Sequence, residues 1–220
     1  MCTQWWKDMI TPKLAQIAST GHNELYVGML ACGALVTYEK ARTELMAALN
    51  GIHVAHAFAF STKELQPALT SLFFYHFIHQ VLIERMPLSR RTMATRLEQA
   101  VFIGRHTPLL HFHNEKPEGS PALALPVLTL TEYRWTHDTM RPDGLDIGLQ
   151  CPKCGTLSSR EGKRRVISKK EIKVVVWCRM SGCDWEETYT ILTDAVEELR
   201  TGENGVWTAR KFLDLSASTQ

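Results

Sequence analysis

The residues with the clearest chemistry are four cysteines in two close pairs near the end of the chain. Cys151 and Cys154 form a C-x-x-C pair in "CPKCG", and Cys178 and Cys183 form a second pair in "CRMSGC". Four thiolates complete the tetrahedral shell that Zn²⁺ prefers, and a complete shell has no position for water or substrate. The spacing predicts one structural Zn²⁺ ion. Free or redox-active cysteines are the alternative interpretation.

Between the two pairs the chain is rich in positive charge. Residues 151–192 carry nine Lys or Arg against five Asp or Glu. Such a cluster can contact phosphates through charge, so the segment is a candidate nucleic-acid surface. In the alternative interpretation the charges keep exposed strands soluble and block edge pairing. The candidate contact residues are Arg160, Lys163, Arg164, Arg165, Lys169, Lys170 and Lys173.

Cys32 is a second candidate for chemistry. It lies in "LACG", where a predicted strand ends in a turn. Ligand and catalytic groups of open α/β sheets gather at the carboxyl ends of strands, which favours a reactive thiol. A lone cysteine is also a common small buried hydrophobe. The nine histidines show no complete metal-ligand pattern, and we interpret them as core or surface residues.

The elements that would position Cys32 follow a strand–helix order. "LYVGMLACGALV" and "GIHVAHAFAF" are short apolar runs that predict buried strands, and "TYEKARTELMAALNG" between them predicts a helix. This order is that of a βαβ unit with parallel strands. The segment "LQPALTSLFFYHFIHQVLIERM" predicts a long helix that is apolar almost all round and therefore buried on more than one side. Ser89 to Gly104 predicts a further amphipathic helix.

The second half of the chain changes character. Prolines and glycines between 114 and 148 predict a surface connector. The residues between the cysteine pairs predict a β-hairpin, and "DWEETYTIL" after the second pair predicts a third strand. We therefore expect an α/β protein with a small parallel sheet, flanking helices and a C-terminal β zinc ribbon. The expected division is an α/β half-domain at 1–113, a connector at 114–148, a zinc ribbon at 149–192, and a C-terminal helix and tail at 193–220.

Three segments of the first half resemble a known family. "LYVGMLACGALV", "GIHVAHAFAF" and "LFFYHFIHQVLIERMPLSRRTMATRLEQAV" are similar to the second half of the caspase-like fold, especially its CHAT branch. Together with the terminal "CPKCG" ribbon they are also similar to proteins of mushroom-forming fungi. The resemblance covers residues 24–104.

The resemblance implies that Cys32 would be the nucleophile of a cysteine peptidase, activated by a histidine on a neighbouring strand. His22 is the one histidine that precedes Cys32. An extended strand of ten residues would separate the two by ~30 Å, which is too far for a hydrogen bond. We therefore expect a non-catalytic zinc-ribbon protein that acts as a binding module. A caspase-like cysteine hydrolase is the alternative.

Composition and termini indicate where such a module acts. The chain of 220 residues has no secretory signal pattern and no apolar run long enough to span a membrane. Paired cysteines without a signal favour a reducing, intracellular location, cytoplasmic or nuclear. The expected partners are a protein, a nucleic acid through the hairpin, or a second copy, because a half-sheet has an open edge near its first strand.

Overall fold

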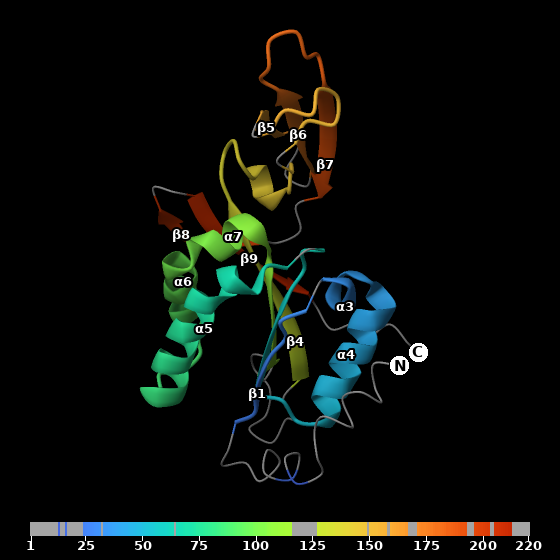
Figure 1. The fold of residues 1–220 in the computed structure, drawn as a ribbon. Coiled ribbons are helices and arrows are strands. Elements are labelled where there is room, and N and C mark those ends of the chain that lie inside the picture. Colours follow the sequence, from blue (N-terminus) through green and yellow to red (C-terminus); the bar gives the residue numbers. More distant parts are fainter. Residues whose placement is uncertain are drawn as a thin grey trace. The chain divides into compact units, whose positions relative to one another are not determined.

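The computed structural model describes most of the chain. The described residues are 13, 16, 24–31, 33–63, 65–115, 127–148, 150–157, 159–166, 171–192, 196–202 and 205–212. They form two compact units, of which the first comprises 1–71, 106–133 and 211–220 and the second 72–105 and 134–210. The chain is shown in Figure 1. Among the described residues, no helix combines the length and the apolar character needed to cross a membrane.

The first unit begins with the predicted βαβ arrangement. Strand β1 (Tyr26–Gly28) is followed by helices α3 (Ala34–Thr37) and α4 (Glu39–Gly51) and by strand β2 (His56–Phe60). β1 and β2 are parallel, as the sequence predicts. Gly33 allows the chain after β1 to pass close to the segment after β2, because a Cβ at this position would lie 2.1 Å from the carbonyl oxygen of Ser61.

The sheet is mixed, and the prediction of a parallel sheet is wrong. Strand β3 (Leu109–Glu115) pairs antiparallel with β2, and β4 (Val127–Thr136) pairs antiparallel with β3. The strand order in this unit is β1-β2-β3-β4. Apolar periodicity identifies strands but does not set their direction. The long helical connection between β2 and β3 is compatible with either orientation.

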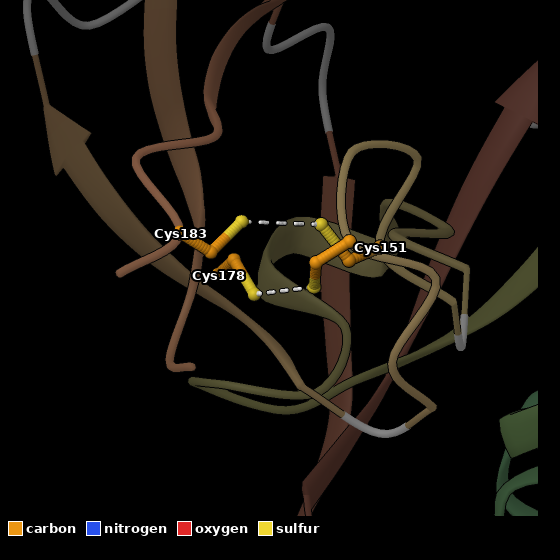
Figure 2. A group of neighbouring side chains, drawn as sticks. Cys151, Cys178 and Cys183 are labelled. Atoms are coloured by element: carbon orange, nitrogen blue, oxygen red, sulfur yellow. Dashed lines mark hydrogen bonds between the residues drawn. The ribbon is translucent and has the colours of Figure 1, made fainter. Parts of the chain in front are cut away.

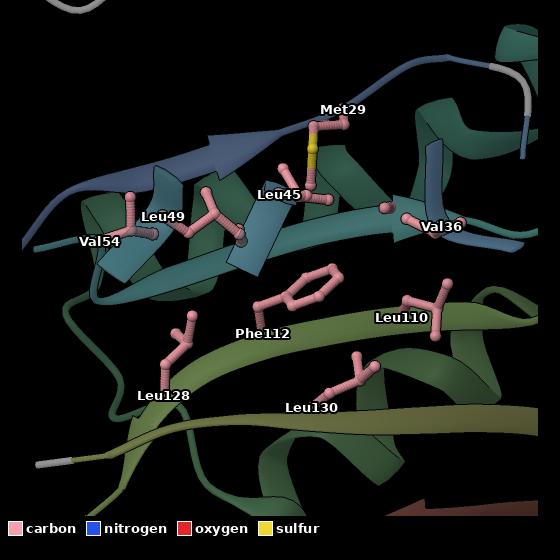
Figure 3. Close-up of a cluster of buried hydrophobic side chains, with 11 residues drawn as sticks. Met29, Val36, Leu45, Leu49, Val54, Leu110, Phe112, Leu128 and Leu130 are labelled. Atoms are coloured by element: carbon pink, nitrogen blue, oxygen red, sulfur yellow. The ribbon is translucent and has the colours of Figure 1, made fainter. Parts of the chain in front are cut away.

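One face of these strands carries the core of the first unit. Alternate residues of β2, β3 and β4, such as Ala57, Phe112 and Leu130, point to the same side (Figure 3). Leu45 and Leu49 of α4 cover this side and are fully buried. The predicted apolar face of the helix therefore packs against the sheet.

Helices dominate the start of the second unit. They are α5 (Ser71–Phe77), a π-helical stretch Ile78–Ile83, α6 (Arg90–Gln99) and α7 (Val101–His106). A 3₁₀ turn at Pro67–Thr70, in the first unit, precedes them in the chain. Ser89 caps α6 as predicted, and its side chain accepts a hydrogen bond from the Thr92 N–H. The prediction of a single helix that ends at Gly104 is wrong, because the helix is interrupted at Ala100 and α7 then continues to His106.

The apolar segment around α5 is not buried on more than one side. Phe73, Phe77 and Val81 are buried, whereas Tyr75 and Ile83 are 63% and 67% exposed. Composition alone cannot predict this difference, because burial of a second helix face requires a neighbouring element to cover it.

Two further predictions are corrected in the second half of the chain. The segment at 114–148 contains β4, in which Leu128, Leu130, Tyr133 and Trp135 are buried, so it is not only a surface connector. The predicted C-terminal helix is strand β8 (Val196–Gly202), which pairs with β9 (Gly205–Phe212) in an antiparallel hairpin. Pairing with a neighbouring strand overrides the weak helical preference of "VEELR".

The remaining strands form two groups within the second unit. In the first group, β9 lies beside β4 and β8 lies beside β9. Near Trp135 of β4, the Thr208 hydroxyl of β9 donates a hydrogen bond to the Arg134 carbonyl. A separate three-stranded antiparallel sheet has the order β5-β6-β7, with β5 at Arg160–Val166, β6 at Glu171–Cys178 and β7 at Glu186–Leu192 (Figure 1). It contains the predicted hairpin and third strand, and we call it the ribbon sheet.

Candidate metal centre

The first cysteine pair lies in a tight turn before β5. The Gly155 N–H donates to the Cys151 carbonyl at 3.0 Å, and the Cys151 N–H donates to the Thr156 carbonyl at 3.1 Å. Gly155 has a φ of +71°, a backbone conformation that residues with a Cβ rarely adopt. The glycine therefore lets the chain reverse within a few residues so that Cys151 and Cys154 face the same point.

The second pair uses the same kind of turn at the end of β6. The Cys178 N–H donates to the Trp185 carbonyl and the Cys183 N–H to the Met180 carbonyl, both at 3.0 Å. Gly182 also has a positive φ, of +81°. Each pair of thiols is thus held by a short hydrogen-bonded turn anchored to the ribbon sheet.

The four sulfur atoms converge. All lie within 4.8 Å of one another, with 3.8 Å between the Sγ atoms of Cys151 and Cys183 and 3.7 Å between those of Cys154 and Cys178 (Figure 2). A tetrahedron with Zn–S bonds of 2.3 Å has S–S edges of ~3.8 Å. The donor set therefore fits one metal ion with four thiolate ligands.

Two hydroxyl groups favour ionised cysteines at this site. The Thr156 hydroxyl lies 3.4 Å from Cys154 Sγ and lowers the pKa of that thiol to about 6. The Ser159 hydroxyl lies 3.4 Å from Cys178 Sγ and lowers the pKa of Cys178. Cysteine spacing gives no reason to select these two hydroxyl groups, which lie in "TLSS" after "CPKCG".

Repulsion between neighbouring thiolates limits how many of the four cysteines can ionise without a bound cation. The Trp185 N–H lowers the pKa of Cys183, but burial and the neighbouring cysteines raise it to about 12. Several thiolates within 4.8 Å repel one another, and a bound cation removes this repulsion. Metal binding would therefore favour deprotonation of all four thiols.

An ion pair between Lys153 and Asp184 also joins the two turns.

The predicted basic residues do not share one surface. Arg160 lies on the same side of the ribbon sheet as the buried Val174 and Val176, and its guanidinium stacks over Trp185 at 5.4 Å. The backbone of Arg164 pairs with that of Val174 in the register of β5 and β6. Lys169 and Lys170 are outside the described residues.

The opposite side of the ribbon sheet is only partly open, because its central Val175 is buried and Trp177 is half-buried. Lys163 is exposed and Lys173 is half-buried, and the backbone of Arg165 pairs with that of Lys173. Thr188 and Thr190 of β7 are exposed beside them. We call this side the open face. The open face also carries three acidic residues. Glu161 and Glu186 lie nearer the cysteines, and Arg179 neutralises Glu161 in an ion pair at 2.8 Å. Glu171 lies at the other end of β6.

Cys32 is outside the described residues, so the catalytic prediction stays a prediction from sequence. Its neighbour Gly33 donates a backbone hydrogen bond to the Thr62 carbonyl at 2.6 Å. The end of β1 therefore lies beside the loop that follows β2.

The histidines of the sheet form a cluster of their own. His56 Nδ1 lies 3.0 Å from His111 Nε2, and the rings of His111 and His113 stack. Burial lowers the pKa of His56 to about 4 and holds the pKa of the buried His111 well below its usual value. Within the described part of the chain, the four cysteines are the only group with metal-ligand geometry. His111 is thus a core residue, whereas His53 and His79 are exposed.

No family model matches this chain, and neither the curated proteins nor the solved structures contain a match. The resemblance to the caspase-like fold and to fungal proteins is therefore an expectation from sequence.

Proposed function

We propose that the protein is a non-catalytic binding module built on a zinc ribbon, with one structural Zn²⁺ ion held by four cysteines. The observation that carries the proposal is the spacing of the sulfur atoms, 3.7 and 3.8 Å along two edges of a tetrahedron. Four thiolates fill the coordination shell, so the ion would stabilise the ribbon without meeting a substrate.

Metal analysis of the purified chain tests this assignment. We expect one Zn²⁺ per chain, and Co²⁺ exchanged into the site should show the visible absorption of a tetrahedral thiolate complex. Cys154→Ser should weaken metal binding strongly, because only three thiolates would remain. Cys2→Ser is the matched control and should retain one ion. A wild-type chain that binds no metal, or equal loss in both variants, would contradict the proposal.

The partner that we propose is a nucleic acid contacted through the open face. The register of β5 and β6 brings three basic residues close together. Arg165 of β5 pairs with Lys173 of β6, and Lys163 lies two residues before Arg165. Exposed threonines on β7 can add hydrogen bonds to phosphate oxygens. Because the contacts would be mainly to phosphates, binding should depend strongly on salt and weakly on base sequence.

Fluorescence anisotropy with labelled oligonucleotides across a salt series tests the partner. The double variant K163A/K173A should weaken binding and reduce the slope of log K against log salt by about 2, since each lost phosphate contact removes roughly 0.9. K40A/K63A removes two exposed lysines of the first unit and should leave the slope unchanged. If the chain with zinc bound does not bind even at low salt, the charges instead serve solubility.

A further inference from the structure

The strongest unexplained feature outside the ribbon is an apolar stripe on α5 and the π-helical stretch after it. Six large apolar side chains between residues 72 and 86 are each 41% to 67% exposed. We call them the α5 stripe: Leu72, Tyr75, Ile78, Leu82, Ile83 and Met86. Single exposed apolar residues are common on protein surfaces, but a contiguous set marks an interaction site.

Helix geometry places these side chains together. Leu72, Tyr75 and Ile78 follow at intervals of three, so they lie on one face of α5. Beyond Ile78 the helix widens to π geometry, in which residues four and five positions on share a face. Leu82 and Ile83 therefore continue the stripe.

The stripe is not the face that the second unit uses for its own core. Phe73, Phe77 and Val81 occupy the other side of the same helical segment and are at most 6% exposed. The rings of Tyr75 and His79 stack with centroids 6.3 Å apart, and His79 Nδ1 lies 3.4 Å from a carboxylate oxygen of Glu84. Tyr75, a member of the stripe, thus packs against a side chain of its own helical segment.

Area and charge favour a second copy of the chain as the occupant. At about 200 Å² for a large side chain, six half-exposed residues present on the order of 600 Å². Two such faces would bury about 1,200 Å², the lower end of the range for stable interfaces. The flanking charges, Glu84 and Arg85, cancel. Residues 72–86 therefore carry no net formal charge, whereas an anionic membrane or a nucleic acid would require an excess of cations.

Tyr75 and Ile83 stand at equal distances in sequence from His79, and both lie on the helical segment. In an antiparallel pair centred on His79, Tyr75 lies opposite Ile83 of the second copy, so the same apolar contact occurs on both sides of the axis, as a two-fold interface requires. Nearer the axis, Ile78 lies opposite Gln80 and Leu82 opposite His76, so Tyr75 and Ile83 supply the central apolar contacts. We propose that the protein forms a homodimer through antiparallel packing of the α5 stripe. This dimer does not depend on the open edge of the sheet or on zinc.

Sedimentation equilibrium of the full chain with zinc bound tests the dimer and its register. The wild type should be a dimer at micromolar concentration. Tyr75→Glu and Ile83→Lys should each weaken it by roughly tenfold or more, because a charge replaces a central apolar contact. An equimolar mixture of the two variants should dimerise again, since Glu at 75 would then face Lys at 83 while the second contact stays apolar.

Tyr38→Glu is the matched control, because Tyr38 is 68% exposed outside the stripe, and this variant should remain dimeric. A monomeric wild type overturns the proposal. A dimer that persists in both Y75E and I83K also overturns the proposal, because the interface would then lie elsewhere. If both single variants are monomeric and their mixture stays monomeric, the antiparallel register is wrong. Zinc content, measured on the same samples, reports separately on the ribbon.

Discussion

Burial decides the chemistry of individual side chains in the sheet. His56 and His111 lie opposite the apolar core face, in contact with each other and beside His113. Burial disfavours their charged forms, and Glu24 offsets this only in part for His56. They are therefore neutral residues of the fold near pH 7. A sequence pattern could count these histidines but could not show that β2 and β3 bring them together.

This arrangement predicts a pH dependence of stability. The folded pKa of His56 is about 4, below the unfolded value of 6.5, so the unfolded chain binds more protons between these values. The stabilising effect is complete above pH 6.5 and is lost as the pH falls toward 4. A buried histidine of this kind contributes a slope of up to about 1.4 kcal/mol per pH unit between its folded and unfolded pKa values.

Urea unfolding at several pH values checks this prediction. His111→Phe removes one buried titrating ring and keeps an aromatic ring in its place, so its unfolding free energy should fall less steeply below pH 6.5 than that of the wild type. His53→Asn removes an exposed histidine at a position of positive φ and should keep the wild-type slope. Equal slopes for wild type and H111F would refute the argument.

At the scale of elements, helix α7 depends on a close approach to two tryptophans. A Cβ on Gly104 would lie 2.5 Å from atoms of both Trp135 and Trp207, while the Gly104 carbonyl accepts a hydrogen bond from Arg141 at 2.6 Å. The glycine therefore serves packing between α7, β4 and β9. The sequence suggested that this glycine ends a helix, because glycine is a common stop signal.

Gly104→Ala should lower the unfolding free energy by about 1–3 kcal/mol, since the added methyl group overpacks the core around the tryptophans. Gly51→Ala is the matched control: a Cβ there meets nothing within 4 Å, so the change should be neutral or slightly stabilising through helix propensity. Thermal unfolding followed by tryptophan fluorescence distinguishes the two variants. A neutral G104A would show that α7 can move away from the sheet at little cost.

At the scale of the whole molecule, the two units should respond differently to loss of metal. The cysteine cluster holds the turns at the ends of the ribbon sheet, whereas the first unit has its own apolar core under α4. Small metal-dependent domains gain much of their folding free energy from the ion.

Hydrogen exchange with and without a zinc chelator checks this difference. Chelation should raise exchange in β5, β6 and β7 strongly and leave α4, β2 and β3 close to their protected level. Re-addition of Zn²⁺ should restore protection of the ribbon. Unchanged exchange in β6 after verified metal removal would mean that the small core around Ile147, Val174 and Val176 holds the ribbon without the ion.

Several features follow from sequence alone because they depend on local spacing. The two cysteine pairs, the hairpin between them, the helix with Leu45 and Leu49 on one face, and the Ser89 cap are all set by neighbours within a few residues. Tertiary structure decided the mixed direction of the sheet, the burial of β4, the strand at β8, the division of the basic residues between two faces, and the exposure of the α5 stripe. These depend on which distant segments pair or cover one another, and residue periodicity does not encode that information. The four thiols could thus be recognised from their spacing, but only the fold shows that their sulfur atoms meet at distances that suit one metal ion.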